Sequence, residues 1–342
     1  MKYTPGSSTQ FLRFFPAAAF LVVGSCFLLN VLIDPLWFFG GNKLQPKNFV
    51  FNERVAKTAL LSRQPGHYDC IIFGSSRVTL INEKKIKGFR CFNYGVSAGT
   101  AVDSLYLARI AKKYVKDPRL ILIGVEDFNW IRSRPLDSSK PPRPLSRMLE
   151  TPSSIAYYFG LAALGMSVKT LLDLSPSPRF YDDNFTIKIR SGEHALREGT
   201  ADIGLDVFPT AEQVGKNVDA AVQIFRRIRL EFPSSKVVGF VPFTPIEVIR
   251  NNLAKIGIDN YLQSQIVLGS CFDEFWDFSV PSEVTSRREW IYDGNHFYPS
   301  ANELLVSRII EGEPGSLAFK LSSADGEGWE AAERYEARLS SR

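Results

Sequence analysis

Two widely separated motifs carry residue types that could together perform nucleophilic acyl transfer. One is Gly74-Ser75-Ser76, which directly follows a short apolar run, and the other is Asp293, followed three residues later by His296. A carboxylate at that spacing can orient an imidazole, which can then remove the proton of a serine hydroxyl. Neither motif is specific alone. Gly-Ser-Ser turns often cap helices, and a single His beside aromatic residues is more often structural. The prediction therefore depends on the two motifs meeting in space.

Two further features could bind a substrate near that serine pair. The segment 93–100 (NYGVSAGT) contains Ala98 and Gly99, and its small residues would let backbone N–H groups approach a ligand. A plain turn into a helix is the alternative interpretation. Arg77 either binds an acidic substrate group or makes a structural salt bridge, which is the commoner role.

These motifs need structural elements that bring them to one edge of a sheet. Short apolar runs predict buried strands, and apolar residues at helical spacing predict the helices between them. The predicted strands are 70–73, 90–93, 120–123, 236–241 and 275–278, and the predicted helices are 102–115, 211–232, 247–268 and 300–311. This alternation indicates a parallel sheet covered on both faces, in which ligands bind beyond the carboxyl ends of the strands.

The order of the motifs resembles the SGNH (GDSL-like) hydrolase superfamily. The shared pattern is a serine after the first strand, small residues after the second, and Asp-x-x-His before the last helix. With an N-terminal apolar segment, the sequences GSSR and YDGNHF are similar to the membrane-anchored envelope branch, which includes proteins of alginate O-acetylation and teichoic-acid D-alanylation. The resemblance covers residues 69–130 and 236–310. It implies an α/β three-layer sandwich with a central parallel sheet, of the SGNH or flavodoxin-like type.

The resemblance also implies roles for individual residues. Ser76 matches the nucleophile, His296 the base and Asp293 the residue that orients it. The oxyanion would be bound by the backbone N–H of Ser76 and by one from the Ala98–Gly99 turn. The implied protein is an extracytoplasmic esterase or O-acyltransferase that needs no cofactor. Its implied partners are an envelope polysaccharide or acyl donor and a membrane-bound acyltransferase.

The sequence departs from the family pattern in three places. Ser75 stands where the commonest motif has Asp, and Ala98 stands where the oxyanion glycine is expected. Asp127 occupies the position of an Asn side-chain donor, and Asn129 could replace that donor only if the turn bulges. The loss of one such donor lowers turnover about 10²–10³-fold.

Two other hypotheses remain beside the enzyme. In the first, the protein is a catalytically weak or inactive SGNH-like binding or scaffold protein of an envelope polymer-modifying complex, as an ionised Asp127 would favour. In the second, it is a plain α/β domain with chance motifs, which leaves the N-terminal apolar segment unexplained.

The segment Phe14–Ile33 predicts a transmembrane anchor. It is a charge-free apolar run of 20 residues, which is about the length that crosses a bilayer core of about 30 Å. Lys2 and Arg13 are the only charged residues before it, so we expect a cytoplasmic N-terminus and a periplasmic main domain at the inner membrane. A cleaved signal peptide is less favoured because no A-x-A site follows. A lipoprotein box at 23–26 is also less favoured, because the apolar run continues past it.

The expected organisation is a tethered domain with one insertion. Its parts are a cytoplasmic N-terminus (1–13), the anchor (14–34), a connector (35–66), the SGNH-like domain (67–312, with an insertion at about 131–210) and a polar tail (313–342) with a loose helix near 329–339. Within the insertion, Lys169 and Asp173 interrupt the apolar run Ile155–Leu174. This run therefore predicts a buried or cap helix rather than a second span.

Composition excludes some classes of partner. There are 41 Lys and Arg residues against 36 Asp and Glu, with no basic run, so nucleic acid is not expected as a partner. The cysteines and histidines do not cluster, so no metal site is expected. Cys70 and Cys91 each lie on a predicted strand. They either pair as a disulfide, if those strands are neighbours, or remain buried free thiols.

Overall fold

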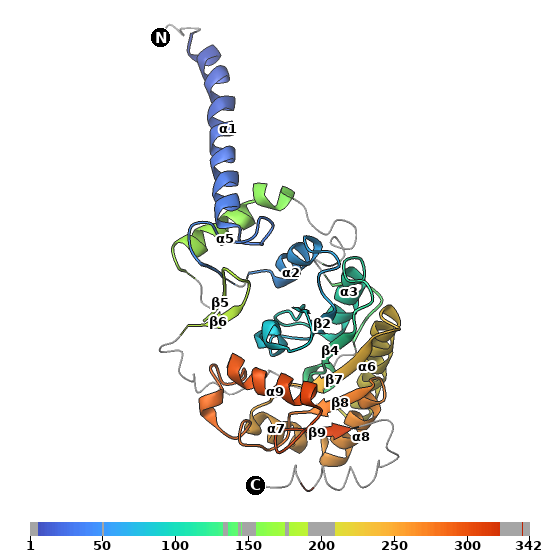
Figure 1. Cartoon of the computed structure of the whole chain (residues 1–342). Coiled ribbons are helices and arrows are strands. Elements are labelled where there is room, and N and C mark those ends of the chain that lie inside the picture. The colour runs from blue at the N-terminus through green and yellow to red at the C-terminus, as the bar shows by residue number, and fades with distance from the viewer. Residues whose placement is uncertain are drawn as a thin grey trace. The chain divides into compact units, whose positions relative to one another are not determined.

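The computed structural model divides into two compact units, Met1–Leu60 with Ser153–Arg190, and Leu61–Pro152 with Ser191–Arg342 (Figure 1). It describes residues 6–49, 51–132, 136–142, 145, 155–174, 178–190, 209–321 and 337.

The larger unit is built on a six-stranded, mostly parallel sheet, which confirms the predicted α/β class. The strands are β2 (Cys70–Phe73), β3 (Cys91–Asn93), β4 (Leu120–Gly124), β7 (Lys236–Val241), β8 (Glu274–Asp277) and β9 (Phe319–Leu321). Their order is β3-β2-β4-β7-β8-β9, and only β9 runs antiparallel to its neighbour. The sequence does not predict β9, because a three-residue strand inside a polar tail has no periodicity. The tail helix expected near 329–339 falls almost entirely outside the described residues.

The helices of this unit follow the predicted alternation with one correction. They are α3 (Ala101–Ala111), α6 (Ala211–Glu231), α7 (Ile246–Ile256), α8 (Ile258–Gly269) and α9 (Pro299–Glu311). Capping boxes at Thr100 and Thr210 fix where α3 and α6 begin. The single helix predicted over 247–268 is wrong. Gly257 has a φ of 80°, which ends α7 and starts α8.

The core of this unit forms around the central strands of the sheet. Every residue of β2 and β4 is buried, as expected of parallel strands. On one face, Ile72, Leu122 and Val238 form a cluster with Ala301 and Leu305 of α9. Each fully buried aliphatic side chain of this kind contributes about 1.5–3 kcal/mol to stability.

A disulfide joins β2 to β3. Cys70 and Cys91 are directly paired in the parallel register, with Cα atoms 4.2 Å apart, and their sulfurs are bonded. Of the two alternatives that the sequence leaves open, the structure therefore has the disulfide. Cys26 and Cys271 are free.

We expect mass spectrometry of the denatured, unreduced protein to find two alkylated cysteines, Cys26 and Cys271. Prior reduction should raise the number to four, because only then are Cys70 and Cys91 free thiols. The matched control is a Cys70→Ser, Cys91→Ser variant, in which reduction should change nothing. Alkylation of all four cysteines without reduction would contradict the disulfide.

The smaller unit combines the N-terminal helix with the inserted segment. Its elements are α1 (Gly6–Ile33), β1 (Lys47–Phe49), α2 (Glu53–Ser62, whose last residues belong to the larger unit), η4 (Ile155–Phe159), α5 (Leu161–Leu171), β5 (Arg179–Asp182) and β6 (Ile187–Ile189). The strands form an antiparallel sheet in the order β1-β5-β6. The stretch Phe14–Ile33 of α1 is long and apolar enough to cross a membrane, a test that a signal sequence also passes.

The helix expected over Ile155–Leu174 is present as η4 and α5, but it is not a buried helix. Only Ala163, Ser167 and Thr170 of α5 are buried, whereas Leu161 is 85% exposed. Of the two expected roles, a buried or a cap helix, burial is wrong, because the small and polar stripe, not the apolar side chains, packs against the rest of the unit.

Candidate active site

Ser76 lies in the turn that leaves the carboxyl end of β2. Gly74 allows this turn, because a Cβ at that position would lie 2.4 Å from a methyl group of Val78. The turn is tightened by Ser75, whose carbonyl accepts hydrogen bonds from the N–H groups of Val78 and Thr79. Ser76 is left half-buried, with its Oγ 2.8 Å from Nε2 of His296. The structure thus brings together two residues 220 positions apart in the sequence.

His296 is carried on a tight hairpin just before α9. The hairpin is closed by a hydrogen bond from the N–H of Tyr292 to the carbonyl of His296, and by the bridge between Ile291 and Phe297. Gly294 makes the reversal with a φ of 84°, which favours glycine. Phe297 is buried in the core, so the imidazole is held on a fixed support.

Asp293 holds the other nitrogen of the imidazole. Its Oδ2 lies 2.8 Å from Nδ1 of His296, and its Oδ1 accepts hydrogen bonds from the N–H groups of His296 and Asn295. Burial alone would raise the pKa of the Asp293 carboxyl, but the hydrogen bonds and the charge of His296 lower it below the usual value. The carboxylate therefore stays ionised at neutral pH, and Nδ1 of His296 carries the proton that it binds.

Ser75 does not contact His296 as Ser76 does, because its hydroxyl points to a different partner. Its Oγ and its N–H both donate to Oε1 of Glu126, which is 1% exposed. Burial raises the pKa of Glu126, and the opposing effects of Arg77 and of the Ser75 hydrogen bonds offset this only in part. The sequence analysis missed Glu126. The available signal was its position just after β4, the strand that pairs with β2.

Arg77 lies in a buried polar network, where it bridges the serine turn and the histidine hairpin. Nη2 donates to Oδ1 of Asn295 at 2.8 Å, and Nη1 lies 3.4 Å from Oδ1 of Asp127 and 3.2 Å from the Thr244 hydroxyl. With 4% exposure, Arg77 has the structural ion pair that the sequence favoured. The network also supports His296, since Asn295 is its neighbour in the chain.

Asp127, which stands at the position of the family's side-chain oxyanion donor, is held by two partners. One carboxylate oxygen faces Arg77, and the other accepts a hydrogen bond of 2.6 Å from Asn252. Asn129 lies beside the start of α3, where its Oδ1 accepts the N–H of Ala101. The side-chain carbonyl of Asn129 therefore serves as a cap for that helix.

The Ala98–Gly99 turn offers one backbone donor rather than a choice of two. The N–H of Gly99 is used in a hydrogen bond of 2.9 Å to the carbonyl of Val96. Ala98 has a φ of 52°, the left-handed conformation expected where the family pattern has glycine, and its side chain is exposed. In the described part of the chain, the N–H of Ala98 donates to no acceptor. It is therefore the donor that this turn could give to an oxyanion.

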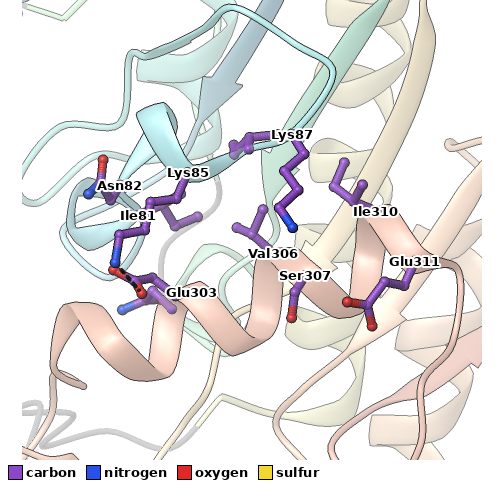
Figure 2. Close-up of a pocket in the computed structure, with 11 residues that line it drawn as sticks. Ile81, Asn82, Lys85, Lys87, Glu303, Val306, Ser307, Ile310 and Glu311 are labelled. Atoms are coloured by element: carbon purple, nitrogen blue, oxygen red, sulfur yellow. Dashed lines mark hydrogen bonds and ion pairs between the residues drawn. The ribbon is translucent and has the colours of Figure 1, made fainter.

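A separate pocket of about 140 Å³ lies between the segment after β2 and helix α9. Figure 2 shows Lys85 and Glu303 meeting across it, in an exposed ion pair of 2.7 Å. Its lining consists of Ile81, Asn82, Lys85, Ile86, Lys87, Asn302, Glu303, Val306, Ser307, Ile310 and Glu311. None of these belongs to the Ser76–His296–Asp293 set. Among the described residues, no group of three or more His, Cys, Asp or Glu side chains is placed to hold a metal ion.

Two comparisons with known proteins found nothing similar. The sequence matches no protein-family model, and a search of curated proteins finds no match. The interpretation of the site therefore depends on its geometry.

Proposed function

We propose that the protein is an acyl-transfer enzyme of the SGNH type, an esterase or O-acyltransferase, with Ser76 as its nucleophile. The observation that carries this proposal is the continuous chain of hydrogen bonds from Ser76 through His296 to Asp293, at 2.8 Å for each link. A hydroxyl, an imidazole and a carboxylate in this order form the arrangement that activates serine in unrelated hydrolases.

The reaction follows from these contacts. Oγ of Ser76 attacks the carbonyl carbon of an ester while Nε2 of His296 takes its proton. The tetrahedral oxyanion collapses, and the imidazolium returns the proton to the leaving alcohol, so that an acyl-Ser76 ester remains. Water or a sugar hydroxyl then attacks this ester while His296 takes its proton. The bond between the acyl carbon and Oγ of Ser76 breaks, the imidazolium returns the proton to Ser76, and the acid or new ester leaves. Asp293 stabilises the imidazolium in both halves, and the N–H of Ala98 is a candidate donor to the oxyanion.

The sheet order supports the same family. The parallel strands β3-β2-β4-β7-β8 have the order 2-1-3-4-5 of flavodoxin-like folds, in which ligands bind where the strand order reverses. That point lies between β2 and β4, the strands followed by Ser76 and Asp127 respectively. We propose that α9 on one face and α3, α6 and α8 on the other complete a three-layer sandwich.

We further propose that α1 is a retained anchor that holds the domain outside the cytoplasm, where an envelope polysaccharide would be its substrate. The last turns of α1 support retention over cleavage, because they are part of the folded smaller unit. Asn30 is 1% exposed and bonds to the carbonyl of Tyr158 and the hydroxyl of Ser167. Cleavage of a signal peptide that included Asn30 would remove this amide and expose the Tyr158 carbonyl and the Ser167 hydroxyl that it contacts. The Cys70–Cys91 disulfide is also suited to an oxidising compartment.

A second candidate is a scaffold with little catalysis. The observation that favours it is Asp127 at the position of the family's side-chain oxyanion donor, where its carboxylate accepts hydrogen bonds from Arg77 and Asn252.

A covalent probe separates the two candidates. We expect the full chain in detergent to form a single adduct with an aryl phosphonofluoridate, located by peptide mapping at Ser76, because that hydroxyl contacts the imidazole of His296. A Ser76→Ala variant should take up no label, and a His296→Ala variant should take it up much more slowly. If the folded wild-type chain is not labelled at Ser76, the proposed nucleophile is wrong and the scaffold remains.

A further inference from the structure

The smaller unit carries an apolar surface that its own fold leaves uncovered. We propose that η4 and α5 lie in the membrane interface beside the anchor helix and insert their exposed apolar side chains among the lipids. This inference rests on the proposed role of α1 as a membrane anchor. It adds a second point of membrane contact, formed by a segment more than 120 residues later in the sequence.

The protein leaves only the first part of the apolar stretch of α1 bare. Residues Phe14–Ser25 are all exposed, whereas Cys26–Ile33 are half-buried or buried, except Leu28. Twelve helical residues span about 18 Å, which is well short of a bilayer core of about 30 Å. The remaining turns of the span must therefore be in the membrane together with whatever packs on them.

The segment that packs on those turns is η4 with α5. Phe27 stacks on Phe159 with ring centroids 4.3 Å apart, and Asn30 bonds to the carbonyl of Tyr158 at 2.8 Å. Ser167 donates to the other end of the Asn30 amide, also at 2.8 Å. The polar amide in the apolar helix is thus satisfied by η4 and α5, as hydrocarbon surroundings require. These contacts place the segment at the level of the last turns of the span.

The face that η4 and α5 turn outward has the chemistry of a lipid-contacting surface. Exposed large apolar side chains dominate it, and they are Ile155, Phe159, Leu161, Val168, Leu171, Leu172 and Leu174. A soluble surface rarely gathers so many, whereas an interfacial helix needs them. The two charged residues of this segment, Asp173 and Lys169, are compatible with a position in the membrane interface. Asp173 is ion-paired with Lys47 and Arg190, and the exposed Lys169 can extend its stem toward lipid phosphates.

Site-directed spin labels test the depth of this segment in the full chain. Leu161→Cys and Leu172→Cys are each labelled in a Cys26→Ser, Cys271→Ser background, which keeps the Cys70–Cys91 disulfide. Val23→Cys on α1 is the lipid reference, and Glu212→Cys on α6, 76% exposed, is the water reference. The protein is reconstituted in liposomes of phosphatidylethanolamine and phosphatidylglycerol. Collisions with oxygen, which concentrates in lipid, are compared with those of a water-soluble nickel chelate.

We expect the labels at Leu161 and Leu172 to collide with oxygen more often than the Glu212 label does but less often than the Val23 label at mid-span, and to collide with the nickel chelate several-fold less often than the Glu212 label. Nickel collisions at the level of Glu212, with Val23 still in lipid, would overturn the interfacial position alone. Low collision rates with both reagents would also overturn it, because they would mean that another protein surface covers α5. If the Val23 label too reports water, the anchor itself is wrong. The acyl-transfer proposal is tested separately by the phosphonate probe.

Discussion

Replacing Ser76 with alanine is expected to reduce the kcat for hydrolysis of a chromogenic acetyl ester by about 10⁴-fold or more, the range seen when a nucleophile of this kind is removed. The variant loses the hydroxyl that contacts Nε2 of His296, so no acyl-enzyme can form. The fold should be unaffected, because Ser76 is half-buried and the turn is held by backbone bonds to Ser75. Steady-state kinetics and the thermal midpoint, measured on the same full-length preparation, check both statements.

Ser75→Ala is the matched control, since it makes the same change one residue earlier. It removes the hydroxyl that donates to the buried Glu126 and leaves the contact of Ser76 with His296 intact. We expect the free energy of unfolding to fall by about 1–3 kcal/mol, the cost of a lost partner for a buried polar group. The kcat should fall far less than in Ser76→Ala. Normal turnover by Ser76→Ala together with an inactive Ser75→Ala would reverse the assignment.

The change Asp293→Asn is expected to lower kcat by about 10⁴-fold with little change in KM, as happens when the orienting carboxylate of such a triad becomes an amide. An amide can donate to Nδ1 of His296, which would place the imidazole proton on Nε2, where the base must be free. Since the pKa of Asp293 is lowered, its carboxylate is ionised at neutral pH and supports the imidazole of His296 there. This support of turnover is lost only as the pH falls through that lowered value. Wild-type activity should therefore keep its carboxylate support well into the acid range.

The control for this prediction is His67→Ala, a change at an exposed histidine outside the site, which should leave kcat unchanged. The Asp293→Asn variant should also keep its thermal midpoint within a few degrees, because Asp293 makes its contacts within its own hairpin. Full activity in Asp293→Asn would show that the bond between Asp293 and His296 has no part in turnover.

Much of the sheet could be predicted from the sequence. The runs that became β2, β4 and β7 are short, apolar and rich in β-branched residues, and strands buried on both faces have this composition. The meeting of Ser76 with His296 was predictable because each follows or precedes an element whose end lies at the same edge of a parallel sheet. The two residues need only local turns to face each other.

The rest of the site depends on contacts that no local pattern encodes. Glu126 supports the serine turn only because β4 pairs with β2 in a register that places it beside Ser75. In the same way, Asn252 reaches Asp127 from α7, which the sequence merged with α8 into one helix. For α5 the sequence left a buried or a cap helix open, because apolar composition alone does not show which side of a helix meets protein and which meets another surface.

The bond between Cys70 and Cys91 has one more consequence if the domain lies outside the cytoplasm, as proposed. It closes a covalent ring, 21 positions from cysteine to cysteine, and the serine turn lies inside that ring. If an extracellular protease cut the backbone once between those cysteines, the two fragments would stay attached to each other. In the nicked molecule the disulfide would still join the adjacent strands β2 and β3, so Ser76 and His296 would stay in one covalently linked molecule.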